Sequence, residues 1–335
     1  MINYMLLGPW IKRFLMEYLI SVKNFSSNTQ HSYRDTLCLL LSFMARQARK
    51  TADQLTVEDI SAERLQLFLM DLEQTRRSSI ATRNQRLAAI HSLAQFIALY
   101  SPEHIQWCGE ITDIPFKKSP RSLISYLEKT EMDALFSAAE GPMPQQCRDH
   151  ALILFLYNTG ARADEAAQLT IADLDVAHAP QRDHSSAIIR GKGNKLRRCP
   201  LWSQTVNEII PLIKGRSPSE HVFLNRCKQP ITRFGIHTLV ERYAQRALKQ
   251  APSLKTKRVS PHTIRHTSAT HLLRAGVDIN TIRAWLGHVS INTTNIYAET
   301  DLEMKAKALA LCEIETKPVR RWRKNANLME YLRTL

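Results

Sequence analysis

Long hydrophobic runs are absent from this 335-residue sequence, and Ala151–Tyr157 is one of the longest. A membrane-spanning helix needs about 20 consecutive apolar residues, so a transmembrane protein is excluded. No early apolar run follows a charged segment and ends in small residues, so we expect no secretory signal. We therefore expect a soluble, cytoplasmic protein that has no membrane partner.

Paired cysteines are lacking too, because six cysteines lie far apart and none forms a Cys-x-x-Cys pair. This spacing argues against a zinc site and a disulfide framework, and it suits a reducing compartment. The Gly-x-x-x-x-Gly-Lys-Ser/Thr phosphate loop and a carboxylate cluster for a catalytic metal are also missing. We expect no cofactor and no divalent metal in the chemistry. The cysteines are Cys38, Cys108, Cys147, Cys199, Cys227 and Cys312.

Acidic residues are outnumbered, with 31 Asp and Glu against 46 Lys and Arg, which gives a formal charge of +15. A field of that sign favours a polyanionic partner, with nucleic acid first and an anionic membrane surface second. The apolar fraction of 44% is ordinary for a globular protein, and the length suits two domains.

The first hundred residues carry apolar side chains at three- and four-residue spacing, which predicts a group of helices. One helix covers 10–19, a second begins after Ser27, a third is capped by Thr56 or Ser61, and a fourth covers 80–100. Arginines cluster at the start of the fourth helix, where they form either a solvated charged face or a face that grips DNA phosphates. They are Arg76, Arg77, Arg83 and Arg86.

Residues 112–122 predict a linker, because two prolines and three cations occur there without apolar periodicity. Lys117 and Lys118 in this segment are further candidates for DNA contacts. The linker separates a helical domain over 1–111 from a larger, mostly helical domain over 123–312, and a basic tail follows over 313–335.

The second domain contains one expected exception to helix, between Ser186 and Pro200. Two extended runs there flank Gly191-Lys192-Gly193-Asn194, whose turn residues predict a β-hairpin. The predicted fold class is therefore mainly α with a small antiparallel β-sheet. Lys192 lies at the hairpin tip, where flanking glycines let the backbone approach a partner. A lysine in such a turn is more often only solvated.

Two segments place charged side chains near helix ends. Gly160 suits the left-handed position that ends a helix, and Arg162 begins the next helix near Glu165. Alone, this arginine and glutamate indicate a surface ion pair. In the other segment, a Ser-Pro helix start puts His262 and Arg265 on one face at a helix N-terminus, which suits a phosphate oxyanion.

A metal site is the alternative for that second segment, since His262 and His266 have the spacing of zinc-binding histidines. Thr263 stands where a glutamate would be required, so the metal alternative is disfavoured. A last segment reads Trp-Leu-Gly-His at 285–288, and Tyr297 follows nine residues after His288. Ser290 is expected to cap a helix that carries the phenol back toward His288.

Arginine, lysine, His-x-x-Arg, Leu-Gly-His and tyrosine occur here in one order and with characteristic gaps. In this respect residues 124–312 resemble the active-site signature of the tyrosine recombinase (lambda-integrase) family. His-Thr-Ile-Arg-His-Thr-Ser-Ala-Thr-His-Leu-Leu-Arg-Ala-Gly matches the family's most recognisable block, with Ile264 where leucine is commoner. The helical first domain resembles, less specifically, the family's core-binding (SAM-like) domain. The chain is similar to simple two-domain members, namely transposon and phage integrases and Xer-type recombinases.

The resemblance implies that the enzyme breaks and rejoins DNA, without ATP, through a covalent 3′-phosphotyrosine at Tyr297. Two arginines would hold the phosphate, His262 would take the phenol proton, and His288 would bind a phosphate oxygen. Lys192, or Lys195 in the same turn, would protonate the leaving 5′-oxygen. All positions of the pattern are filled. The catalytic set is Arg162, Lys192, His262, Arg265, His288 and Tyr297.

Partners and assembly also follow from the resemblance alone. Two domains would close around double-stranded DNA, and a homotetramer, alone or with related recombinases, would join paired recombination sites. The 313–335 tail would dock into a neighbouring subunit or touch DNA. An integrase or transposase of a mobile element is the favoured function. The alternatives are a chromosome-dimer resolvase, a type IB topoisomerase and a non-catalytic DNA-binding regulator.

Overall fold

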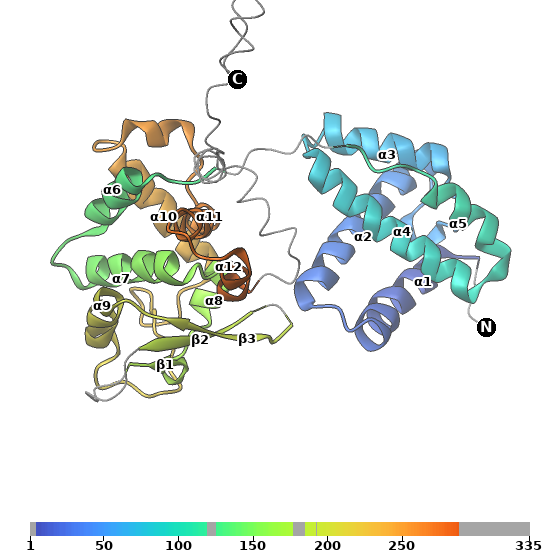
Figure 1. Cartoon of the computed structure of the whole chain (residues 1–335). Coiled ribbons are helices and arrows are strands. Elements are labelled where there is room, and N and C mark those ends of the chain that lie inside the picture. Colours follow the sequence, from blue (N-terminus) through green and yellow to red (C-terminus); the bar gives the residue numbers. More distant parts are fainter. Residues whose placement is uncertain (1–4, 119–124, 177–184, 192, 288–335) are drawn as a thin grey trace, which may run out of the picture. The chain divides into compact units, whose positions relative to one another are not determined.

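The structure is a computed structural model that describes residues 5–118, 125–176, 185–191 and 193–287. The chain forms two compact units, Met1–Ser122 and Leu123–Leu335 (Figure 1). The predicted fold class, mainly α with a small antiparallel sheet, is confirmed. No helix of the described residues combines the length and the apolar character that crossing a membrane requires.

All the regular elements in the described part of the first unit are helices or helical turns. Serine side chains cap three of its helices, because the hydroxyls of Ser26, Ser61 and Ser79 each accept a hydrogen bond from a free backbone N–H of the first turn. Its elements are α1 (Leu7–Arg13), a π-helix (Phe14–Val22), α2 (Ser27–Ala48), a 3-10 turn (Ala52–Gln54), α3 (Ala62–Gln74), α4 (Ile80–Tyr100), a 3-10 turn (Pro102–His104) and α5 (Ile105–Thr112).

Two features of this unit differ from the sequence prediction. The helix expected over 10–19 begins as α1 and continues as the wider π-helix, in which Phe14 and Tyr18 both contact the ring of Phe96. Helix α5 was not predicted, since it is only 8 residues long. It is held by tertiary contact, because the Trp107 indole donates a hydrogen bond to the carbonyl of Ile60 at 2.7 Å.

The second unit combines helices with one three-stranded antiparallel sheet in the order β1-β2-β3. Its elements are α6 (Lys129–Ala139), α7 (Pro144–Thr159), α8 (Ala163–Ala167), a 3-10 turn (Ile171–Asp173), β1 (Leu174–Asp175), β2 (Ser186–Arg190), β3 (Leu196–Pro200), α9 (Ser203–Ile213), α10 (Arg233–Ala247), a 3-10 turn (Pro252–Thr256), α11 (Pro261–Arg274) and α12 (Ile279–Leu286).

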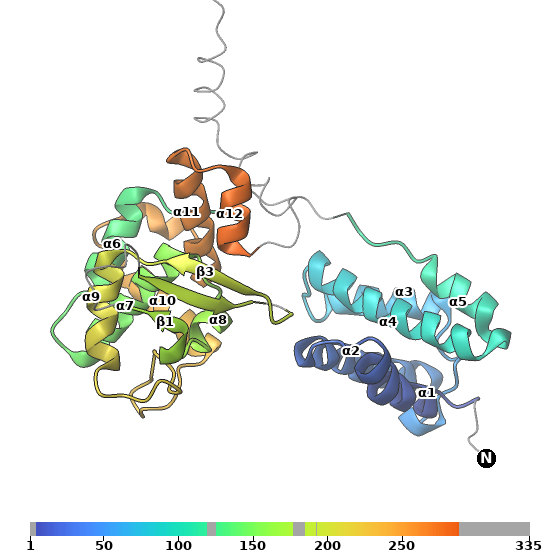
Figure 2. The same ribbon diagram turned by 60° about the horizontal axis from the view of Figure 1, so that its bottom comes forward.

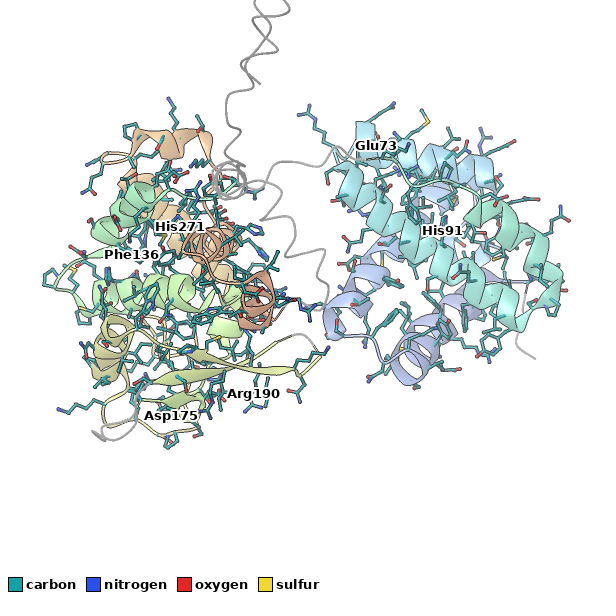
Figure 3. The ribbon with its side chains drawn as sticks, in the orientation of Figure 1. Glu73, His91, Phe136, Asp175, Arg190 and His271 are labelled. Carbon is teal, nitrogen blue, oxygen red and sulfur yellow. The ribbon has the colours of Figure 1, made fainter. Side chains whose placement is uncertain are left out.

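Strands β2 and β3 form the predicted hairpin, and Ser186 pairs with Pro200 at its base. The short strand β1 was not predicted, because two residues give no readable alternation. Arg190 of β2 donates a hydrogen bond to Asp173 at 3.2 Å, and Asp175 lies on the edge strand β1 (Figure 3). Helices α8 and α12 lie beside β2 and β3 respectively (Figure 2).

Helix α7 is the central element of the second unit and contacts α6, α8, α9 and α11. Its residues 149–159 are buried, and Tyr157 among them contacts Phe136 of α6 and His271 of α11. Phe136 and His271 are labelled in Figure 3. The helix ends at Gly160, whose φ of 60° lies in the left-handed region, as the sequence predicted.

Gly160→Ala tests this helix end. Alanine at φ 60° is strained, and its Cβ would also overlap the Leu286 side chain of α12. We expect a loss of about 2–4 kcal/mol in the free energy of unfolding, from left-handed strain plus overpacking. Gly276→Ala is the matched control, since Gly276 has a φ of 85° and no neighbour within 4 Å of the new Cβ. Urea denaturation that shows equal losses for the two variants would contradict the packing account.

Candidate active site

The site begins at the junction of α7 and α8, where Arg162 and Glu165 interact twice. The backbone N–H of Arg162 donates to Glu165 Oε2 at 2.9 Å, and its guanidinium donates to Oε1 at 2.6 Å. Glu165 is only 7% exposed, whereas the Arg162 side chain is 34% exposed. The pair is therefore more than a surface ion pair: a buried carboxylate fixes an arginine that still reaches solvent.

A second arginine, Arg197 of β3, completes the contacts of Glu165, and the sequence reasoning missed it. Its Nη2 donates to Glu165 Oε2 at 2.6 Å, and its Nε donates to the carbonyl of Trp285 in the last turn of α12 at 2.9 Å. In the sequence it stands beside Arg198, and nothing in that local pattern tells which of the two points inward.

The charge of Glu165 is stabilised by these two arginines. Burial alone would raise the pKa of the carboxyl group, but hydrogen bonds and charge from Arg197, with further hydrogen bonds from Arg162, lower it from 4.5 to about 2. Glu165 is therefore ionised at neutral pH, and its negative charge is paired with the two arginines.

Arg265 of α11 is 2% exposed and links the ends of two other helices. Its guanidinium donates to the carbonyl of Gly160, after α7, at 2.5 Å and to the carbonyl of Leu286, at the end of α12, at 2.6 Å. Carbonyls at helix C-termini lack partners within the helix and attract cations, so this placement is favourable. Because Gly160 stands two positions before Arg162 in the sequence, this contact brings Arg265 close to Arg162.

His262 lies in the first turn of α11, which begins at Pro261 and is capped by Ser260 as predicted. The residue is open to solvent, yet protein atoms around the ring remove part of its hydration. This desolvation, together with the charges of Arg265 and Arg162, lowers the pKa of His262. The imidazole is therefore neutral near pH 7 and has a lone pair to accept a proton.

His266 follows one turn later, and its ring centroid lies 6.4 Å from that of His262. Desolvation first, and then His262 and Arg265, lower the pKa of His266 to about 4. Within the described ranges, no group of three or more His, Cys, Asp or Glu side chains is arranged to hold a metal ion.

Several predicted residues lie outside the described residues: Lys192, His288, Ser290, Tyr297 and the tail over 313–335. Their neighbours in the sequence are described. Gly191 closes the hairpin turn by donating its N–H to the carbonyl of Lys195 at 2.8 Å, and Lys195 is exposed. Gly287 ends α12 with a φ of 65°.

The predicted DNA-facing residues of the first unit gather where α3 ends, α4 begins and the linker starts. Arg76, Arg77, Lys117 and Lys118 are exposed. Arg86 is half-buried and donates to the Ser78 hydroxyl at 3.1 Å, and desolvation lowers its pKa.

Arg83 departs from its predicted place on an exposed basic face. It is 6% exposed, lies 3.5 Å from a carboxylate oxygen of Glu73, and donates to the carbonyl of Pro115 at 3.1 Å. Asn84 exchanges two hydrogen bonds with the backbone of Lys117, at 2.8 and 3.1 Å. Hydrogen bonds from Arg83 and Asn84 thus hold residues 115–117 of the predicted linker against α4. The nearby carboxylate of Glu73 offsets the cost of burying the Arg83 charge.

Comparison with known proteins agrees with this arrangement. Residues 125–304 match the phage integrase family, and residues 11–99 match the N-terminal SAM-like domain of phage integrases. The chain is 35% identical over 331 residues to the integrase/recombinase y4rC of Sinorhizobium fredii, covering 98% of each protein. It is 30% identical over 307 residues to the tyrosine recombinase XerC of Listeria innocua, covering 88% of this chain and 94% of that protein.

Two solved structures share the fold. The Tn1549 transposon integrase in complex with transposon right end DNA has a TM-score of 0.67 at 19% identity, covering 91% of this chain and 98% of that chain. XerH bound to a palindromic difH substrate has a TM-score of 0.64 at 22% identity, covering 87% of this chain and 82% of that chain.

Glu165→Gln tests the buried charge through pH. A carboxylate whose pKa falls from 4.5 to about 2 on folding contributes stability above pH 4.5 and loses it as the pH falls toward 2. We expect the free energy of unfolding of the wild type to be about 3 kcal/mol larger than that of the variant at pH 6, from the size of that pKa shift. This difference should shrink below pH 4.5. Urea unfolding across this range measures it, with the exposed neighbour variant Asp164→Asn as the charge control. A difference that stays constant with pH would contradict the assignment.

Proposed function

The chain belongs to the phage integrase family and is a tyrosine-type recombinase that breaks and rejoins DNA, and we propose that it does so through a covalent bond between Tyr297 and a 3′-phosphate. The observation that carries this proposal is the meeting of three helix ends. The end of α7, the start of α8 and the start of α11 bring Arg162, Arg265 and His262 together, and all three match the family pattern.

The two arginines suit a phosphodiester whose non-bridging oxygens gain charge during attack. The Arg162 side chain stays partly open to solvent while Glu165 fixes the direction of its guanidinium. Arg265 holds a permanent charge in a buried place, where water screens it little. Preorganised donors of this kind contribute about 3–4 kcal/mol each to transition-state stabilisation.

Proton transfers complete the proposed step. The Tyr297 oxygen bonds to phosphorus while His262, whose lowered pKa keeps it neutral, takes the phenol proton. The bond from phosphorus to the 5′-oxygen breaks, and Lys192 supplies the proton that this oxygen needs. His288 binds a phosphate oxygen. The phosphotyrosine conserves the ester, so a second strand's 5′-hydroxyl reseals it without ATP.

Double-stranded DNA with paired recombination sites is the proposed substrate. The exposed Arg76, Arg77, Lys117 and Lys118 offer phosphate contacts from the first unit. Proteins of the same fold, such as XerH and the Tn1549 integrase, are seen on their own DNA sites. We propose a homotetramer that joins two sites in the cytoplasm, and a tail over 313–335 that docks in a neighbouring subunit.

The biological task proposed is integration or transposition of a mobile element. Similarity to an integrase/recombinase over 98% of the chain supports it. Chromosome-dimer resolution is the second candidate, since the chain also matches XerC of Listeria innocua at 30% identity.

Tyr297→Phe tests the covalent step. Wild type and variant are incubated with a duplex of the gene's native flanking DNA, nicked so that the cleaved end diffuses away. On denaturing gels we expect protein attached to DNA for the wild type and none for the variant, because phenylalanine has no oxygen to attack phosphorus. Tyr100→Phe, at an exposed tyrosine of the first unit, is the control and should keep the attached species.

Two further outcomes separate the alternatives. Attachment without exchange between two sites, together with relaxation of supercoiled circles, would indicate a type IB topoisomerase. Tight binding without any attached species would indicate a DNA-binding regulator.

A further inference from the structure

Arg197 is a buried side chain of the hairpin that the proposed reaction does not use. Its side chain is 9% exposed, although arginine is rarely buried without a partner. It binds Glu165 of α8 and the carbonyl of Trp285 of α12 at the same time. One residue of β3 therefore connects the hairpin to two other elements of the site.

The next residue on the strand provides a contrast. Arg198 points to the other face, its side chain is 64% exposed, and it lies 3.5 Å from Asp175. Alternation along a strand explains the opposite directions. Exposed pairs of this kind contribute little, whereas the buried pair at Arg197 fixes a geometry.

Two glycines lie against Arg197. A Cβ on Gly191 would come within 3.5 Å of the Arg197 guanidinium and 3.4 Å of the Glu165 carboxylate. A Cβ on Gly287 would come within 3.2 Å of Arg197 Cδ. Gly191 directly precedes Lys192, and Gly287 directly precedes His288. The Arg197 side chain therefore packs against two glycines, and each glycine directly precedes a residue of the proposed catalytic set.

We propose that Arg197 is a positioning residue, which ties the hairpin to α8 and α12 so that the proton donor carried by the hairpin meets the leaving 5′-oxygen of the phosphate held by Arg162. The inference rests on the proposed function, and it extends it to a residue outside the six of the catalytic set. Arg197 acts through geometry and does not touch the substrate.

The chemistry of the leaving group separates positioning from a general loss of structure. In the natural substrate the bond from phosphorus to the 5′-oxygen breaks, and the electron pair on that oxygen requires a proton. In a duplex with sulfur at this bridging position, the bond from phosphorus to sulfur breaks and a thiolate leaves without a proton. A misplaced proton donor therefore slows cleavage of the oxygen substrate only.

The experiment measures single-turnover cleavage of nicked native flanking duplexes at saturating protein, with oxygen or sulfur at the bridging position. Arg197→Met should bind the DNA like the wild type and cleave the oxygen substrate about 100-fold more slowly, as misplacements of about 1 Å do. On the sulfur substrate it should come within about threefold of the wild type, since the remaining machinery is intact. On the oxygen substrate, the cleavage rate of Arg197→Lys should lie between those of the wild type and Arg197→Met, because an ammonium lacks the planar fork that binds both partners. Arg198→Met is the matched control and should cleave both substrates at the wild-type rate.

Cleavage of both substrates by Lys192→Ala and Lys195→Ala distinguishes a failure of the positioning role from a failure of the proposed function. Sulfur rescue of one lysine variant identifies the donor, and rescue of Arg197→Met beside it supports positioning. An equal loss for Arg197→Met on both substrates would overturn the inference while leaving the lysine assignment in place. Rescue of Arg197→Met with neither lysine rescued would also overturn it, since the arginine itself would then be the donor. If Arg197→Met does not fold, Arg197→Lys decides by the same criterion.

Discussion

The buried carboxylate of Glu165 is the constraint on which the site depends. A charge in this place is costly unless it is paired, and two guanidiniums pair it from different directions. Arg162 reaches it from the start of α8, and Arg197 reaches it from β3. Because the same Arg197 also holds the end of α12, one negative charge fixes the relative position of three elements that are far apart in the sequence.

Helix ends supply the rest of the site. The left-handed residues Gly160 and Gly287 end α7 and α12, and Arg265 binds the carbonyls released at both places. His262 stands at the opposite kind of end, the N-terminus of α11, where backbone N–H groups favour an anion. Orphan backbone groups and side chains thus converge on one region, which suits a phosphate that must be held while its bonds change.

Local sequence signals predicted many of the helix ends and turns that form the site, but they did not predict the long-range pairings between side chains. The Ser260 cap, the left-handed Gly160 and the hairpin follow from neighbouring residues and appear as expected. Of the two cap candidates Thr56 and Ser61, the structure uses Ser61, whose hydroxyl accepts from the N–H of Arg64, because Thr56 instead donates to Asp59 three residues later. The inward turn of Arg197 and the burial of Arg83 depend on Glu165 and Pro115, which lie 32 residues away from them in the sequence. A single sequence does not reveal such pairs.

Peptide mapping of the covalent protein–DNA species tests the attacking residue most directly. The species is isolated, digested with protease and nuclease, and the nucleotide-bearing peptide is sequenced by mass spectrometry. Attack by Tyr297 predicts one modified peptide, which contains Tyr297 joined to a nucleotide through its 3′-phosphate. A nucleotide on another residue, or one joined through a 5′-phosphate, would contradict the proposed reaction.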